Sequence, residues 1–568
     1  MTAVSAQADS RVDGPDPILL EVMQNAFATV AEEMGTALQR TAYSTNIKDR
    51  LDFSCAVYAA DGSLVAQAEH IPLHLGQLSW GIKNLLACLP ADALEPDTIF
   101  MVNDTQVTGA HFPDILMVKP VFCGSSLVGI VANLAHHVDV GGFAPGSLYS
   151  GAQEAFQEGI RIPPVRIVRK GQVNEDILNF LLSNTRTERE NRGDCYAQIA
   201  ALNAGEQKIR DLIARYGAET LVAYMRHVIA YAERRMRAAM AALPVAASSF
   251  EDVLEGDGIT RRRIPIRVTV SAGPGRLSFD FSRSSRQVRG PINAARPFTL
   301  ACVGFAAKAI LDPSVPANEG IFRPFNVITR PGSIVDARFP AAMSNNSSIL
   351  GLRIVDVLFG ALSEIFPGRV TAASSGTMNV VTIGGHDPRR GEPFAYIEAY
   401  GGGQGAAQGH DGMDGMQSTT SNTRNAPAEV IERYYPLRVL RYGLVDGSGG
   451  AGEFRGGLGL LREIAFEADS TISIVSDRHV VRPWGLFGGG PGGAAQCLLT
   501  LPGGRQFALP PKVTRHVKRG SKLYLATAGG GGFGDSASRS PARRAQDSMN
   551  QLAPERHRAP EDAGRHTR

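Results

Sequence analysis

Glycine is unusually dense between residues 371 and 535, and it restricts this part of the chain to short strands, tight turns and closely packed backbone. The chain holds 62 glycines in 568 residues, about one in nine, against a usual share of roughly 7%. The densest runs are residues 401–405, 488–493 and 529–532. Because glycine has no Cβ, it tolerates turns and close backbone approaches that exclude other residues. We therefore expect a β-rich C-terminal part.

The glycine runs are also candidate phosphate loops, but their surroundings favour tight turns. The spacing G-x-G-x-x-G starts at Gly447, Gly488 and Gly529, in strand-and-turn surroundings rather than between a strand and a helix. The sequence contains no G-x-x-x-x-G-K-[ST] loop. We therefore predict that this chain has no cofactor-binding residues for ATP.

Helical periodicity and short apolar runs alternate in the rest of the chain. Apolar residues recur at helical spacing over 17–42, behind an Asp16-Pro17 start signal, and again over 197–243. Residues 52–67 predict a hairpin around Asp61-Gly62, and a helix is expected near 78–86. Buried strands are expected within residues 98–104, 115–122 and 126–140, and a further hairpin within 261–282.

These patterns predict an α+β, or mixed α/β, fold: a large multi-layer mixed-sheet protein with a long helical segment and a Gly-rich, β-rich C-terminal part. A chain of 568 residues is too long for one ordinary core. The predicted divisions are a disordered N-terminus (1–15), an N-terminal α/β domain with the metal site (16–245), an αβ middle domain (246–370), the Gly-rich domain (371–535) and a disordered tail (536–568).

Composition favours a cytoplasmic globular protein. The formal net charge is +3, so nothing suggests nucleic acid or a membrane surface as a partner. No apolar run approaches the roughly 18–20 residues of a membrane span, and residues 1–14 lack the apolar stretch of a signal peptide. The six cysteines are scattered without a Cys-x-x-Cys pair, which favours reduced thiols.

Potential metal ligands are concentrated in residues 103–142. The chain has only 12 histidines, yet this stretch contains three of them and three aspartates: Asp104, His111, Asp114, His136, His137 and Asp139. Pro113 lies between His111 and Asp114, which favours a rigid loop over a helix. Imidazole and carboxylate ligands suit zinc, manganese or iron.

The residues alone leave metal binding and ordinary packing about equally supported. Neighbouring side chains on a strand point to opposite faces, so His136 and His137 cannot both face one site. Asp52, just ahead of a predicted strand, is a possible fourth ligand, although capping of a turn is the simpler interpretation.

The same segments resemble the hydantoinase B family over nearly the whole chain. The matching motifs include R-T-A-Y-S-T-N-I-K-D-R-L-D-F-S-C-A (40–56), H-I-P-L-H-L-G (70–76), N-D-T-Q-V-T-G-A-H-F-P-D (103–114), A-H-H-V-D-V-G-G (135–142), E-G-I-R-I-P-P (158–164) and G-G-G-G-F-G-D (529–535). The family segment after N-D usually reads P-Y-x-G-G-x-H. This chain has Thr105-Gln106 and Thr108 where the family has P-Y and the first G, which leaves the ligands but alters the pocket.

The resemblance implies a divalent metal held by Asp52, His111, Asp114 and His136. It also implies a hydantoinase A-type partner that uses ATP, a hetero-oligomer such as α2β2, and a cyclic amide substrate such as a hydantoin, 5-oxoproline or a related lactam. We expect the partner to phosphorylate the amide oxygen, and metal-activated water in this chain to open the ring. His137 or Asp139 would orient a ligand or carry a proton.

Two alternatives remain open from the sequence. Related chains belong to acetone and acetophenone carboxylases, in which ATP activates a ketone and bicarbonate. A non-catalytic scaffold that closes the partner's active site is the other possibility. The sequence does not identify the ring substrate or the metal.

Overall fold

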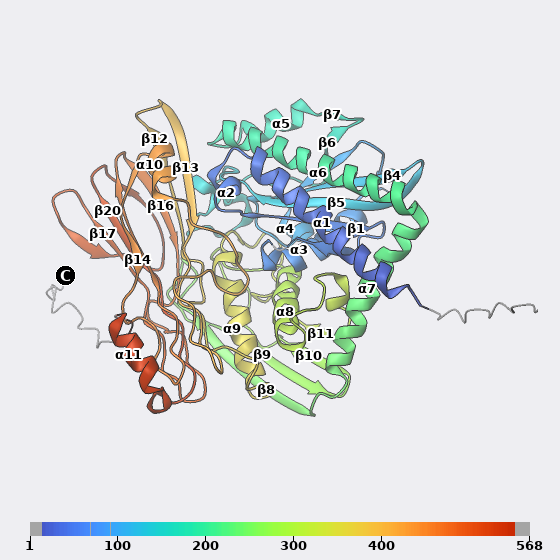
Figure 1. Cartoon of the computed structure of the whole chain (residues 1–568). Coiled ribbons are helices and arrows are strands. Elements are labelled where there is room, and N and C mark those ends of the chain that lie inside the picture. The colour runs from blue at the N-terminus through green and yellow to red at the C-terminus, as the bar shows by residue number, and fades with distance from the viewer. Residues whose placement is uncertain (1–13, 69, 91, 551, 553–568) are drawn as a thin grey trace, which may run out of the picture.

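A computed structural model describes residues 14–68, 70–90, 92–550 and 552. The predicted disordered N-terminus lies outside these residues, except for residues 14–15. Within the described part of the chain, no helix has the length and apolar character needed to cross a bilayer. The mixed α+β fold class predicted from the sequence is confirmed: helices accompany four sheets (Figure 1).

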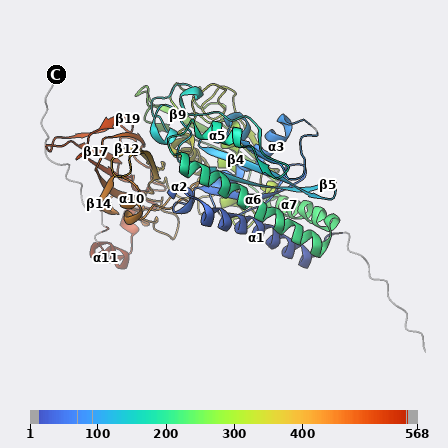
Figure 2. The same cartoon turned by 90° about the horizontal axis from the view of Figure 1, so that it is seen from above.

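Three long helices cover one face of a seven-stranded sheet (Figure 2). They are α1 (Pro17–Thr41), α6 (Glu188–Tyr216) and α7 (Ala218–Met240). The strand order is β2-β1-β5-β4-β3-β6-β7, with β1 (Phe53–Ala59), β2 (Leu64–Gln67), β3 (Ile99–Val102), β4 (Asp114–Cys123), β5 (Ser126–His136), β6 (Val165–Arg169) and β7 (Gln172–Val173). The short helices α2 (Thr45–Lys48), α4 (Thr105–Thr108) and α5 (Glu175–Leu182) lie in the connections.

The helix over 17–42 and the hairpin over 52–67 are confirmed, whereas the helical segment 197–243 needs a correction. It starts earlier, at Glu188, and it is two helices rather than one. Gly217 separates them with a φ of +83°, a left-handed conformation that ends α6 and that other residues rarely adopt.

The other face of the seven-stranded sheet shares one core with the middle of the chain. On β1, Phe53 and Val57 pack under the long helices, while Tyr58 faces the second core. That second core includes α3 (Pro72–Cys88), α8 (Arg296–Leu311), α9 (Gly351–Leu362) and a sheet of order β11-β10-β9-β8, with β8 (Ala246–Leu254), β9 (Ile264–Gly273), β10 (Arg276–Asp280) and β11 (Asn326–Ile328). The predicted boundary at 245/246 therefore marks a change in secondary structure inside a continuous core.

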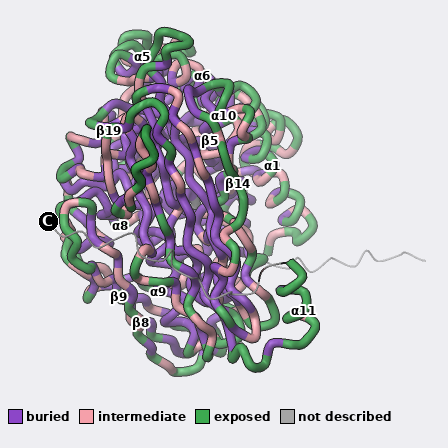
Figure 3. Tube along the Cα trace, turned by 90° about the vertical axis from the view of Figure 1, so that its left-hand side faces the viewer, coloured by how far each residue is buried: buried purple, intermediate pink, exposed green. Residues whose placement is uncertain are grey.

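Two further sheets pack together in the C-terminal part. The first has the order β13-β12-β16-β19, with β12 (Val380–Asp387), β13 (Glu392–Ala399), β16 (Ser470–Val475) and β19 (Lys512–Val517). The second has the order β14-β15-β20-β17-β18, with β14 (Leu437–Leu444), β15 (Leu460–Phe466), β17 (Gln496–Thr500), β18 (Gln506–Ala508) and β20 (Lys522–Ala526); α10 (Ala428–Tyr434) precedes β14. β14 forms an exposed edge of this part (Figure 3).

The glycine runs of the C-terminal part lie in closely packed backbone segments. A Cβ on Gly530 would lie 1.9 Å from the carbonyl oxygen of Gln404, closer than any side chain permits. The N–H groups of Gly403, Gly530 and Gly532 donate to carbonyl oxygens of neighbouring segments. These glycines therefore serve backbone packing, and the expected close approaches are confirmed.

The predicted disorder of residues 536–568 is wrong for its first part. Helix α11 (Pro541–Met549) follows Ser540, whose side chain caps it. Arg539 is buried and pairs with Asp411 and Asp547 at 2.8 Å and 2.7 Å, which ties the segment to the C-terminal sheets. The composition of this segment could not reveal the pairing with Asp411, because Asp411 lies far away in the sequence. Residues 551 and 553–568 lie outside the described part of the chain.

Candidate metal centre

The start of β4 and the end of β5 bring three of the predicted ligands together. The two strands are antiparallel, and Asp114 is the register partner of His136. His111 lies one turn ahead of β4, in the loop that follows the left-handed Gly109. One candidate ligand atom from each of His111, Asp114 and His136 lies within 4.8 Å of the others, and all three residues are buried.

The contacts of His111 and Asp114 fix both side chains. Nε2 of His111 lies 3.3 Å from Oδ2 of Asp114, and its Nδ1 lies 2.7 Å from the carbonyl oxygen of Ser344. The rings of His111 and His136 meet edge to face at 4.9 Å. Oδ1 of Asp114 is buried and has no hydrogen-bond partner among the described residues. A buried carboxylate oxygen without a partner is costly unless a cation or water satisfies it.

The surroundings of His111 and His136 shift the pKa values of the two histidines in opposite directions. Burial lowers the pKa of His111, but the Asp114 carboxylate and the Ser344 carbonyl outweigh it and raise the pKa to about 9. Burial, together with the charge on His111, lowers the pKa of His136 to about 3. Burial opposes the ionisation of Asp114, but the neighbouring His111 holds its pKa well below the usual range. At neutral pH the site therefore has a carboxylate, a protonated His111 and a neutral His136.

Asp52 lines the same cavity but stands outside the close group of three. Its carbonyl oxygen accepts the His136 N–H at 3.0 Å, because β1 pairs with β5. Its carboxylate lies 3.8 Å from the buried guanidinium of Arg50. Burial raises the pKa of Asp52, and Arg50 opposes this shift. Asp52 is thus placed to act as a fourth ligand or as a proton acceptor.

The cavity itself is small. Its volume is about 40 Å³, with a lining that includes His74, Leu148, Ser348, Met378, Val380, Ile397 and Thr423 besides the residues above. Roughly 10–15 Å³ of such volume accommodates one water, so the cavity has room for an ion and very few waters. A ring amide is several times larger than a water molecule and requires a wall of this cavity to move.

His74 is a cavity residue that the sequence reasoning did not assign. It lies on the first turns of α3, is buried, and its Nδ1 is 2.9 Å from Oγ of Ser54. Burial lowers its pKa, and the carboxylates of Asp114 and Asp52 oppose this shift. The available signal was its place in the H-I-P-L-H motif, where Pro72 starts the helix.

His137 and Asp139 lie outside the lining of the cavity. Nε2 of His137 lies 2.9 Å from Oε1 of Gln198 on α6, so His136 and His137 point to opposite faces, as expected. The carboxylate of Asp139 accepts the N–H groups of Gly141 and Gly146, each at 2.9 Å, and pairs with Arg186 at 3.0 Å. The catalytic roles predicted for these two residues remain predictions, and their contacts favour structural roles.

Glu158 is a second residue that the sequence reasoning did not assign. Its buried carboxylate accepts the N–H groups of Met343 and Ser344 at 2.9 Å and 2.7 Å. Burial raises its pKa to about 7, against the opposing effect of these N–H groups. Because the carbonyl of Ser344 holds Nδ1 of His111, Glu158 supports the imidazole from behind, as outer hydrogen-bond partners commonly do around metals.

The donor set fits a divalent metal. Two imidazoles and a carboxylate within reach of one point, with an unpartnered carboxylate oxygen, match the ligands of zinc and of other divalent transition metals. Asp52 and His74 line the same cavity and complete a polar shell.

Comparison with known proteins identifies the family. The sequence profile described as hydantoinase B/oxoprolinase matches residues 16–536. The chain belongs to this family. The B-type chain of a putative D-/L-hydantoinase from a Pseudomonas species (strain NS671) is 31% identical over 552 residues, which cover 94% of this chain and 93% of that protein. The 5-oxoprolinase 1 of Arabidopsis thaliana is 35% identical over 549 residues, 91% of this chain but 42% of the plant protein. The chain thus spans about two fifths of the length of that 5-oxoprolinase.

Two solved structures share the fold. The ATP-dependent caprolactamase from Pseudomonas jessenii matches with a TM-score of 0.87 and 28% identity, covering 95% of this chain and 94% of that one. A chain of a nucleotide-free acetone carboxylase matches with a TM-score of 0.88 and 20% identity, covering 95% of this chain and 78% of that one. At that identity the carboxylase likeness concerns the fold alone.

Proposed function

We propose that this chain is the metal-binding subunit of an ATP-dependent cyclic-amide hydrolase and that it acts with a separate ATP-binding subunit. The observation that carries this proposal is the buried group of His111, Asp114 and His136 within 4.8 Å. The names of the relatives support the reaction class, since they include a hydantoinase subunit, a 5-oxoprolinase and an ATP-dependent caprolactamase.

The proposed metal is zinc, manganese or iron, held by His111, Asp114 and His136 with Asp52 as the fourth ligand. When bound, such an ion supplies a Lewis acid that makes water nucleophilic near neutral pH. In the partner subunit, the amide oxygen takes the γ-phosphoryl group of ATP and ADP leaves. Attack by one water at the activated ring carbon gives a tetrahedral adduct, which breaks the C–N bond by expelling the ring nitrogen as an amine. A second water then hydrolyses the resulting acyl phosphate to the carboxylate and phosphate.

The chain's own residues orient the reacting groups. The Ser344 carbonyl and Asp114 fix the ring of His111, and Asn46 contacts Nδ1 of His136 at 3.1 Å. His74 is the group that would accept a proton from the attacking water, because it lines the cavity and lies outside the proposed ligand set.

The first test is the metal content of the purified chain. Wild type is expected to carry about one equivalent of a divalent metal, and His111→Ala is expected to lose it. His410→Ala is the matched control, because His410 is exposed and lies in a distant loop. Equal metal content in wild type and His111→Ala would sink the assigned site.

Activity with the partner subunit separates this proposal from its alternatives. Loss of about 10²-fold or more in ring opening by His111→Ala and His136→Ala supports a catalytic role. Nearly unchanged activity in both variants indicates a scaffold. ATP turnover that requires bicarbonate indicates a carboxylase subunit instead.

A further inference from the structure

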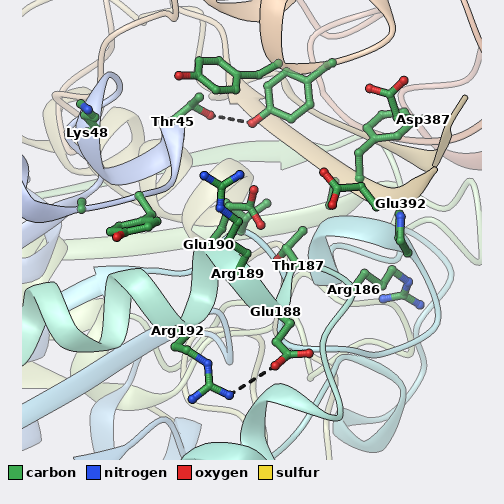
Figure 4. A pocket seen from close by; sticks show the side chains of 18 of the residues that line it. Thr45, Lys48, Arg186, Thr187, Glu188, Arg189, Glu190, Arg192, Asp387 and Glu392 are labelled. Atoms are coloured by element: carbon green, nitrogen blue, oxygen red, sulfur yellow. Dashed lines mark hydrogen bonds and ion pairs between the residues drawn. The ribbon is translucent and has the colours of Figure 1, made fainter. Parts of the chain in front are cut away.

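A second, much larger cavity lies beside the metal centre. Its volume is about 760 Å³, and it lies between the end of α1, helix α2, the start of α6 and strands β12 and β13 (Figure 4). Among the lining residues, six are basic and four are acidic: Arg40, Lys48, Arg186, Arg189, Arg192 and Arg390, against Glu188, Glu190, Asp387 and Glu392. We call it the basic pocket.

Internal ion pairs leave positive charge in the basic pocket. Arg192 pairs with Glu188 at 3.3 Å, a contact drawn in Figure 4, and Arg390 lies 3.8 Å from Glu392. The other paired lining residues, Arg186 and Asp387, have partners outside the lining, Asp139 and Arg389. Within the described part of the chain, the unpaired charged groups of the pocket are the cations Arg40, Lys48 and Arg189 and the anion Glu190.

Two further features favour an anion with an organic part. Helix α6 starts at Glu188 without a side-chain cap, and its first turn lines the pocket, which adds positive partial charge there. The rings of Tyr43 and Tyr434 also line it and are 60% and 44% exposed, so their surfaces are available to a ligand. Three cations from α1, α2 and α6 suit a phosphoryl group, which carries more than one negative charge at neutral pH.

Three chain segments contribute residues to the linings of both the basic pocket and the metal cavity. Each of these segments places some side chains in one cavity and others in the second cavity; the segments are 45–50, 136–138 and 394–399. In α2, for example, Thr45 and Lys48 face the basic pocket, while Asn46 contacts His136 on the other side. In the lining of the basic pocket, Thr45 is joined to Tyr435 by a hydrogen bond of 2.8 Å, drawn in Figure 4.

We propose that the basic pocket binds a phosphate-bearing small molecule, with Arg40, Lys48 and Arg189 neutralising the phosphoryl group. The recognition of phosphate is inferred from the pocket alone. The identity of the ligand, the amide phosphorylated by the partner subunit, rests on the proposed function. The pocket is large enough for such a molecule, and the metal cavity in this conformation is not. The ligand therefore binds next to the site where its ring is opened.

The test is a calorimetric titration of the full-length chain, treated with a chelator, with inorganic phosphate and separately with ADP. Arg189→Ala is expected to weaken binding about tenfold, and the triple variant Arg40→Ala, Lys48→Ala and Arg189→Ala on the order of a hundredfold. Arg505→Ala is the matched control, since this exposed arginine lies in the turn between β17 and β18. Equal affinity for the two probes indicates recognition of the phosphoryl group alone, and ADP binding about tenfold tighter or more indicates a nucleotide.

Two outcomes would overturn the proposal. One is the absence of binding of both probes up to roughly 10 mM. The other is binding that persists in the triple variant but disappears in His111→Ala, which would place the phosphate at the metal centre. The titration needs neither metal nor partner nor ring opening, so its failure leaves the hydrolase proposal standing. Conversely, phosphate binding by a chain that carries no metal when it is purified without a chelator would refute only the hydrolase proposal.

Discussion

Replacing Glu158 by glutamine tests whether the metal centre depends on its outer hydrogen bonds. The carboxylate of Glu158 accepts two backbone N–H groups, from Met343 and Ser344. Glutamine has nearly the same shape but keeps only one oxygen, so its NH2 group faces one of these donors. The Ser344 carbonyl, which holds Nδ1 of His111 at 2.7 Å, would then lose its support.

The magnitude follows from the bonds that change. One buried N–H group left without an acceptor costs about 1–3 kcal/mol. The protein avoids this cost by moving residues 343–344 away from the amide, which releases the imidazole of His111. Removing an outer partner of a ligand imidazole usually lowers metal affinity by ~10–100-fold, or about 1.4–2.7 kcal/mol, which agrees with the cost of the lost bond. We therefore expect Glu158→Gln to bind the metal about 10–100-fold more weakly than wild type.

The assay is competition for the metal with a chromogenic chelator at one pH, together with a thermal melt of each protein. Glu154→Gln is the matched control, because Glu154 is exposed and lies four residues away in the same segment. The reasoning is refuted if folded Glu158→Gln has a metal dissociation constant within about twofold of wild type. An equal loss of affinity in Glu154→Gln would also refute it, since that side chain does not reach the 343–344 segment.

Four other predictions concern single residues. Because the pKa of His111 is about 9, a metal that binds at lower pH must displace the proton of His111. Metal affinity, measured in titrations at several pH values, should therefore rise about tenfold per pH unit up to pH 9 and then level off. His74→Ala should keep its metal but lose about 10²-fold in ring opening, measured with the partner subunit, because His74 lies outside the close group of ligands. Asp139→Asn breaks the pair with Arg186 and should lower the free energy of unfolding in urea by about 3 kcal/mol with unchanged metal content; unchanged stability with lost turnover would support a proton-transfer role instead. Gly530→Ala should yield little soluble protein in expression trials, because its Cβ would meet the Gln404 oxygen at 1.9 Å.

The sequence predicted that His111, Asp114 and His136 lie together, because local chain geometry brings them close. His111 and Asp114 are joined by a short loop, and His136 is the register partner of Asp114 in the neighbouring strand. The alternation of side-chain direction along a strand also predicted correctly that His136 and His137 point to opposite faces. The helix over 17–42 was equally accessible, since both its N-terminal signal and its apolar stripe are local.

The residues that hold the ligands could not be predicted in the same way. Ser344 meets His111 across 233 positions of sequence, and Glu158 acts through a backbone N–H group that any residue could supply. His74 lies on an apolar helix, where a single histidine is more often part of the packing. The order of residues 536–549 depends on Arg539 meeting Asp411, another contact without a local pattern. Local pattern thus identifies which atoms can bind a metal, and long-range packing decides how firmly they are held.

The position of the proposed ligands in the fold limits how a substrate could reach the metal. Asp114 and His136 lie on two hydrogen-bonded strands inside a continuous core, so these two side chains cannot move apart without breaking the seven-stranded sheet. The opposite wall is different, because residues 394–399 belong to the C-terminal sheets, and Arg50 reaches the carbonyl oxygen of Ile397 across the boundary at 2.9 Å. That wall is held by side-chain packing in the shared core and by contacts such as this one, whereas separating Asp114 from His136 also breaks the backbone hydrogen bonds of a sheet. On the proposed function, we therefore expect the ring to enter from the side of β13, which is also the side on which the basic pocket lies.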